Sequence, residues 1–252
     1  LSELRGIIMK TVNNKTVENR AIKNKTFSAK SSLIKAMTLL ALFCGMNSNV
    51  NANTFTESDF NQALITLQHQ WAETNYAKSK KTKTRAFLVL QEESTELTTT
   101  YPNQAEAWIW HGIIQSSYAG FKGGLGSLSL VDDAKDALEK ALAINENALQ
   151  GAAHTSLGIL YLKVPRWPVS FGDDDEAEKH LKIALKMNPT GIDVNYFLAQ
   201  FYFEQEQYKK AQGHLIAASA APARPSRKDA DDYRQLEVNG LLEQVNKQLK
   251  ML

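Results

Sequence analysis

A spacing pattern of alanine and leucine, present three times, constrains this chain more than any other feature of its sequence. In each copy an alanine is followed by a leucine four residues later and by a second alanine three residues beyond, as in Ala177, Leu181 and Ala184. Residues at these intervals lie on one face of an α-helix. The other copies are Ala134, Leu138, Ala141 and Ala211, Leu215, Ala218. We therefore expect three helices that bury equivalent faces.

A further apolar helical segment precedes each copy and carries a small residue where two helices would approach closely. The small residues are Gly112, Gly158 and Ala199, and Ala177 and Ala211 are 34 residues apart. This combination resembles the tetratricopeptide repeat (TPR) family, whose pattern is Trp, Leu-Gly, Tyr, then Ala, Phe or Leu, Ala and Pro. The resemblance covers residues 104–222. The first copy departs from it, with His111 where Leu is usual and Gln115 where Tyr is usual.

The resemblance implies an all-α fold, a short superhelix of antiparallel helix pairs. We expect a signal peptide and basic leader at 1–52, an N-terminal helix pair at 53–103 that is a degenerate repeat or cap, and three repeats at 104–222. Prolines at 222 and 225 break the pattern, and 223–252 is expected to form a C-terminal capping helix. Terminal elements of a stacked array are typically irregular.

Two repeats are longer than the family pattern. Gly112 and Gly158 are 46 residues apart, and Gly158 and Ala199 are 41 apart. We expect the extra residues in long loops between the two helices of a repeat, near 118–127 and 163–175. Such loops would share one edge of the stack and form a binding face. The candidate residues for a partner or ligand in these loops are Phe121, Lys122, Gly123, Gly124, Arg166 and Trp167.

Each loop also has a purely structural interpretation. Its glycines supply unusual backbone angles, since no Lys-Ser/Thr pair follows them as in a phosphate-binding loop. The acidic run 173–176 caps the next helix rather than binding a hard cation. Trp167 is a candidate either for plugging the edge of the superhelix or for binding.

The inward face of the first helices is the usual binding surface of a TPR array. By helical phase it contains the candidates Ile109, Tyr196 and Gln200, with Ile113, Ile159, Trp110 and Phe197 nearby. This face is apolar and aromatic, which argues against a clamp for a peptide carboxylate. Ordinary packing between repeats is the alternative role for Trp110 and Phe197.

Residue types offer little support for catalysis. The five histidines are scattered, without a His-Glu-x-x-His motif, and the sequence lacks a Gly-x-Ser-x-Gly elbow. We expect His111 and His154 to be hydrogen-bonded between helices. The sequence therefore predicts a protein that is not an enzyme, with no catalytic residue, cofactor or bound metal.

The first 52 residues have the pattern of an export signal. They carry eight Lys/Arg and two acidic residues, and an apolar run of about eleven residues at 36–46 precedes Val50-Asn51-Ala52. The run is shorter than the roughly 20 residues that span a bilayer. We predict cleavage after Ala52 and a periplasmic product, with a buried first helix as the alternative. Phe43 beside Cys44 argues against a lipoprotein.

The remaining 200 residues carry a net charge of −4, which argues against nucleic-acid binding. Two functions stay open. One is a periplasmic TPR scaffold that binds another periplasmic protein. The other rests on a resemblance of the two loops to exported TPR proteins of the T-component (TatT-like) group of TRAP-type solute transporters. That resemblance implies an accessory protein, with a homo-oligomer possible, that binds a small and partly apolar ligand.

Overall fold

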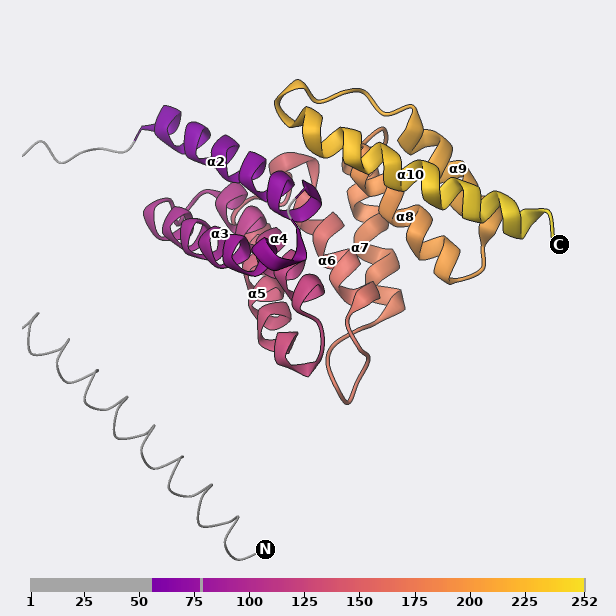
Figure 1. The fold of residues 1–252 in the computed structure, drawn as a ribbon, viewed down its shortest axis with the longest axis horizontal. Helices are drawn as coiled ribbons and strands as arrows, with labels where there is room; N and C mark the ends of the chain where they lie inside the picture. The colour runs from indigo at the N-terminus through magenta and orange to yellow at the C-terminus, as the bar shows by residue number, and fades with distance from the viewer. Residues whose placement is uncertain (1–55, 78, 252) are drawn as a thin grey trace, which may run out of the picture. The chain divides into compact units, whose positions relative to one another are not determined.

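The computed structural model describes residues 56–77 and 79–251, and the signal peptide predicted at 1–52 lies outside them. The described residues form nine α-helices and no β-strand (Figure 1). The helices are α2 (Glu57–Ala72), α3 (Lys80–Thr100), α4 (Ala105–Lys122), α5 (Leu128–Asn145), α6 (Ala152–Lys163), α7 (Asp174–Met187), α8 (Ile192–Glu204), α9 (Tyr208–Ser219) and α10 (Lys228–Leu249).

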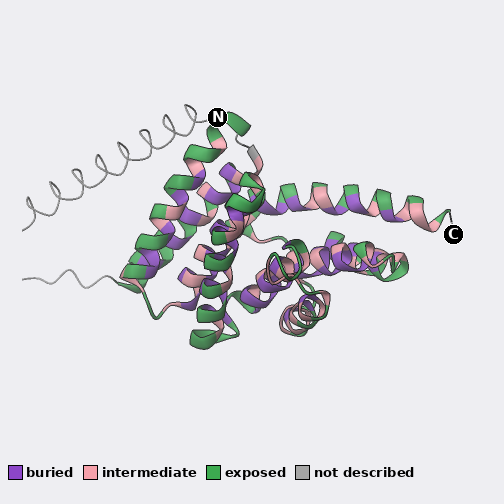
Figure 2. Cartoon of the chain, turned by 90° about the horizontal axis from the view of Figure 1, so that it is seen from below, coloured by how far each residue is buried: buried purple, intermediate pink, exposed green. Residues whose placement is uncertain are grey.

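The helices pack as consecutive antiparallel pairs, α2 with α3, α4 with α5, α6 with α7 and α8 with α9. The first helix of each pair also contacts the first helix of the next, so the pairs stack side by side (Figure 1). Buried residues form stripes on the helices (Figure 2). The predicted all-α fold of stacked helix pairs is therefore confirmed in this part of the chain.

The repeated alanine and leucine residues form the contact within each pair. All nine have 0% relative exposure: Ala134, Leu138, Ala141, Ala177, Leu181, Ala184, Ala211, Leu215 and Ala218. Gly112 faces Leu138, and Gly158 faces Leu181 in the next pair. A β-carbon added at Gly158 would lie 2.6 Å from Leu181 Cγ, closer than atoms tolerate. The small residues therefore set how closely paired helices approach.

The first of the two long loops does not exist, and this corrects the sequence expectation. Residues 118–122 continue helix α4, and only 123–127 separate α4 from α5. The helix continues because its last turn has an apolar face to bury: the rings of Tyr118 and Phe121 lie 5.3 and 5.7 Å from that of Phe87. It ends at Gly123 and Gly124, whose φ angles of 64° and 67° favour glycine.

The second loop lies between α6 and α7, as predicted. It folds back on itself, with Gly172 N donating to Pro165 O at 3.0 Å. Asp173 then caps α7: its carboxylate accepts from the backbone N–H of Asp175 at 2.8 Å and of Glu176 at 3.0 Å. This is the capping role proposed for the acidic run. Trp167 is 86% exposed, so its side chain does not fill the edge of the superhelix.

Helix α10 packs on α9 and α8 and also contacts α2 at the other end of the stack. The contact with the N-terminal pair includes a stack of Tyr233 on Tyr76, whose ring centroids lie 4.8 Å apart. The segment 222–227 leads from α9 into α10. Within residues 56–77 and 79–251, no helix combines the length and the hydropathy needed to cross a bilayer.

Candidate functional site: a cavity along the first helices

A cavity of about 1160 Å³ runs along the first helices of the pairs. Side chains from α2, α4, α6 and α8 form its floor, and residues of the segment 222–227 and of α10 complete its wall. The cavity is therefore formed by helices from every part of the described chain. Its volume is comparable to that of sites that bind small molecules or a short stretch of peptide.

The walls of the cavity are mixed in character. Apolar side chains come mainly from α4, α5, α6 and α8, and include Ile113, Val131, Ile159, Leu160 and Phe197. Hydroxyl and amide side chains, including Ser116, Ser156 and Asn75, also line it. Such a surface favours a ligand that is mostly apolar and carries a few polar groups.

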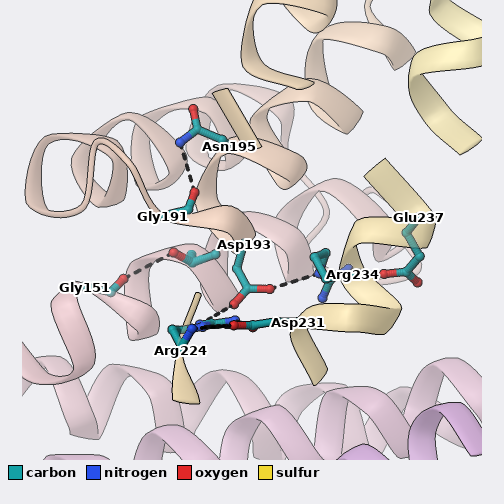
Figure 3. Close-up of polar contacts among 9 residues, drawn as sticks. Gly151, Gly191, Asp193, Asn195, Arg224, Asp231, Arg234 and Glu237 are labelled. Atoms are coloured by element: carbon teal, nitrogen blue, oxygen red, sulfur yellow. Dashed lines mark hydrogen bonds and ion pairs between the residues drawn. The ribbon is translucent and has the colours of Figure 1, made fainter. Parts of the chain in front are cut away.

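One wall carries a cluster of charged side chains centred on Asp193 of α8 (Figure 3). Asp193 Oδ1 accepts from Arg234 Nε at 2.9 Å, and its Oδ2 lies 2.9 Å from Arg224 Nη1. Arg224 Nε also donates to Asp231 Oδ1 at 2.9 Å, and Arg234 Nη1 donates to Glu237 Oε2 at 2.5 Å. The cluster joins α8 to α10 and to the segment 222–227, which forms part of the cavity wall.

Burial and neighbouring charges oppose one another in this cluster. Burial by itself would raise the pKa of Asp193, but Arg234 and Arg224 lower it well below its ordinary value. Burial raises the pKa of Glu237, and Arg234 only partly offsets that effect. Burial likewise raises the pKa of Tyr76, at the edge of the cluster, to about 12. Asp193 is therefore ionised and Tyr76 is a neutral hydroxyl at neutral pH.

Arg227 differs from the other two arginines that line the cavity. Among the described residues its guanidinium has no ion-pair partner, and its carbon Cζ lies 5.0 Å from the ring centroid of Trp110. Burial lowers its pKa, with Asp193 acting in the opposite direction. Trp110 also lines the cavity and is 1% exposed, and its indole Nε1 has no hydrogen-bond partner in the described part of the chain.

The predicted loop candidates are separated by the structure. Gly123 and Gly124, which follow α4, line the same cavity as Val164 and Pro165, which follow α6. Phe121 is half-buried against Phe87, and Lys122 is exposed at the end of α4.

The other two loop candidates lie outside the cavity lining. Arg166 pairs with Asp174 at the start of α7, and Asp174 also accepts from Gln205 Nε2 at 2.7 Å. Trp167 extends into solvent from the same loop. These contacts anchor the base of the loop to the helices while its apolar tip stays exposed.

Of the residues predicted to face inward, some line the cavity, but the candidates Ile109, Tyr196 and Gln200 do not. Ile109 is 0% exposed within the core and is absent from the cavity wall, because its side of α4 faces the neighbouring helices. Tyr196 is covered by Arg234, whose Cζ lies 4.6 Å from its ring centroid, and its hydroxyl accepts from Gln200 Nε2 at 3.2 Å. The cavity wall is formed instead by Trp110, Ile113, Ile159 and Phe197.

The two histidines expected between helices have polar neighbours. His154 lies 2.7 Å from His180, Nδ1 to Nδ1, and its Nε2 lies 2.9 Å from Glu146 Oε1. His111 Nδ1 lies 2.9 Å from Ser94 Oγ. Burial lowers the pKa of His180 to about 4, and the adjacent His154 adds to the effect. In residues 56–77 and 79–251 no group of three or more His, Cys, Asp or Glu side chains is placed to hold a metal ion.

Sequence reasoning missed the charged wall of the cavity. It treated residues 222–226 as a break, although three arginines, Arg224, Arg227 and Arg234, occur within residues 224–234. Arginine is mostly a surface residue, so only a fold that brings α10 back across α8 reveals the pairing with Asp193.

Comparison with known proteins agrees with the repeat pattern. Residues 169–230, which contain α7, α8 and α9, match the family model described as tetratricopeptide repeat. No curated protein matches the chain. A solved thermophilic TPR protein from Thermus thermophilus is similar, with 16% identity, 74% of this chain and 92% of that chain covered, and a TM-score of 0.48. The family match assigns residues 169–230 to the tetratricopeptide repeat pattern, and the helix pairs before them in the described chain pack in the same way.

Proposed function

We propose that this protein is a non-catalytic scaffold that binds a segment of another protein along the cavity. The TPR fold generally serves protein–protein interaction rather than catalysis. The observation that supports the proposal here is the cavity of about 1160 Å³, which follows the first helices of successive pairs. A surface built from several repeats contacts an extended segment at several points.

A matched pair of isoleucine substitutions tests the scaffold. Ile159 lines the cavity, whereas Ile216 of α9 is 57% exposed and is absent from its wall. We expect Ile159→Glu to abolish capture of a specific periplasmic protein that the wild type and Ile216→Glu both retain, because a buried carboxylate disfavours an apolar contact. Affinity purification followed by mass spectrometry measures this. Equal capture by all three proteins would contradict binding through the cavity.

We also propose that the protein is exported to the periplasm. The support is the basic segment, the short apolar run and the small residues that end at Ala52. N-terminal sequencing of protein recovered from a periplasmic fraction tests the proposal, and we expect the mature chain to begin at Asn53. A chain that retains residues before position 53, or that is recovered only from the cytoplasm, would contradict it.

A second function is favoured by the way the C-terminal segment bounds the cavity. The segment 222–227 and the start of α10 lie along its wall and contact α2, and a cavity bounded on this side suits a compact ligand better than a long peptide. This would fit an accessory protein of a TRAP-type solute transporter, the role implied by the resemblance to the T-component group. Native mass spectrometry of protein purified gently from periplasm distinguishes the two functions, since a co-purifying small molecule would support the second.

A further inference from the structure

We propose that the contact between His154 of α6 and His180 of α7 is a pH-sensitive switch, which holds these two helices together at neutral pH and releases them in acid. The inference concerns regulation of the cavity, because α6 also lines the cavity through Thr155, Ser156 and Ile159. Its consequence for binding rests on the function proposed above, whereas the experiment below measures the contact itself.

The hydrogen bonds of the pair fix where its protons lie. His154 Nε2 lies 2.9 Å from Glu146 Oε1, and because a carboxylate only accepts, this nitrogen carries a hydrogen. In a neutral imidazole the other nitrogen then has a lone pair. His154 Nδ1 therefore accepts from His180 Nδ1, which lies 2.7 Å away. The contact requires a single hydrogen between the two Nδ1 atoms.

The pair can bind one additional proton and keep this hydrogen bond, but it cannot bind two. With one added proton, one ring is a cation and the other still supplies the lone pair of its Nδ1. With two, both Nδ1 atoms carry hydrogens, and two positive rings face each other across a separation of 2.7 Å. This arrangement is repulsive, so the second proton breaks the contact between α6 and α7.

The surroundings of the pair disfavour the second proton. His154 is 4% exposed and lies in the first turn of α6, where the helix dipole disfavours a cation. The ring of Tyr161 stacks on that of His180, with centroids 5.6 Å apart, and covers it. Burial and the adjacent His154 lower the pKa of His180 to about 4.

Nearby charged side chains offset this effect only in part. Glu176 Oε2 lies 3.9 Å from His180 Nε2, and Glu176 and Glu139 act to raise the pKa of His180, whereas Lys179 acts to lower it. Glu176 is itself paired with Lys179, and Glu139 with Lys135 of the same helix. Because both carboxylates are already paired, neither holds a second proton on the histidines.

The direction of the pH dependence follows from these values. The pKa of His180 is about 4 in the contact, and its ordinary value is 6.5. A released ring therefore binds a proton more readily than the buried ring, and acid favours the open arrangement. The contact is intact above pH 6.5 and weakens progressively as the pH falls from 6.5 towards 4.

The next helix pair contains the same contact without the second histidine. His214 of α9 lies 34 residues after His180, the repeat length, and Asn195 of α8 occupies the position of His154, four residues before the small residue of its helix. His214 Nδ1 lies 3.0 Å from Asn195 Oδ1, and Tyr202 stacks on His214 with the same 5.6 Å between ring centroids. An amide oxygen accepts from a neutral or a protonated imidazole. Acid therefore leaves this contact intact.

Hydrogen exchange of the full chain, measured by mass spectrometry from about pH 7 to about pH 4.5, tests the proposal. Rates are expressed as protection factors, which remove the intrinsic pH dependence of exchange. In the wild type we expect protection of α6 and α7 to fall about tenfold or more across this range, while that of α8 and α9 changes less than about twofold. His154→Asn copies the arrangement at Asn195 and should abolish the loss. His69→Asn, an exposed change in α2, should retain it.

Three results would overturn the proposal: no loss of protection in acid, an equal loss in both helix pairs, or the same loss in His154→Asn as in the wild type. Circular dichroism shows whether the variant is folded, and His180→Asn takes its place if it is not. The comparison of the two pairs within the wild type needs no variant. Since none of these measurements requires a bound partner, a negative result leaves the proposed function to its own isoleucine test.

Discussion

At the scale of single residues, the contact between paired helices depends on the absence of a side chain at Gly158. A β-carbon there would lie 2.6 Å from Leu181 Cγ, 3.0 Å from Leu181 Cδ2 and 3.1 Å from the carbonyl oxygen of Ala177. Neither the branch point of a fully buried leucine nor a helical carbonyl moves easily, since both are held by close packing. Ala199 occupies the equivalent place in the next pair and is also fully buried. Each pair therefore fixes its own separation between helices.

We predict that Gly158→Ala lowers the free energy of unfolding by about 1–3 kcal/mol, because the added methyl group overpacks the contact with Leu181. Gly120→Ala is the matched control, since Gly120 is exposed within α4 and an added β-carbon meets nothing within 4 Å. That change should stabilise the protein by about 0.5–1 kcal/mol. Urea denaturation followed by circular dichroism measures both. Equal effects at the two sites would show that the close approach is unimportant.

At the scale of elements, the ends of helices decide where the chain is helical and where it forms loops. The apolar last turn of α4 extends it to Lys122, which a loop prediction based on repeat length missed. The 46-residue spacing of Gly112 and Gly158 suggested a long loop there, but the contact of Phe121 with Phe87 depends on a helix from the preceding pair. The start of α7 was predictable, because an N-cap uses local hydrogen bonds that nearby residues specify.

The cap of α7 gives a prediction at this scale. Asp173→Ala should lower the free energy of unfolding by about 1 kcal/mol, because two backbone N–H groups lose their acceptor. Asp175→Ala, an exposed change in the same acidic run, should alter it by less than about 0.5 kcal/mol. Thermal melts of the two variants test the difference. Equal losses would show that the acidic run acts through its total charge and not through capping.

At the scale of the whole described unit, α10 joins the two ends of the stack of helix pairs. It packs on α9, pairs through Arg234 with Asp193 of α8, and contacts the N-terminal pair through the stack of Tyr233 on Tyr76. These contacts complete the cavity, because the segment before α10 forms part of its wall. The wall of the cavity therefore depends on contacts far from its floor.

We predict that Tyr233→Ala loosens the contact between α10 and the N-terminal helix pair. Loss of an aromatic stack is worth about 0.5–1.5 kcal/mol, so amide hydrogen exchange should accelerate in residues 73–77 and 222–234 together. Leu236→Ala is the control, because Leu236 is 67% exposed on the same helix. Hydrogen exchange measured by mass spectrometry resolves these segments. Acceleration confined to residues near position 233 would show that α10 does not hold the N-terminal pair.

The helix pairs were predictable from the amino-acid sequence, because helical periodicity is local and the repeated alanine, leucine and glycine positions specify which faces pack. The cap of α7 and the second loop were predictable for the same reason. The cavity was not, because it emerges from the packing of the whole unit. Arg227 and Trp110 belong to segments far apart in the chain, and they meet because α10 folds back along the first helices. A contact of that kind leaves no periodic signal in the sequence, since it depends on the summed packing of every pair between them.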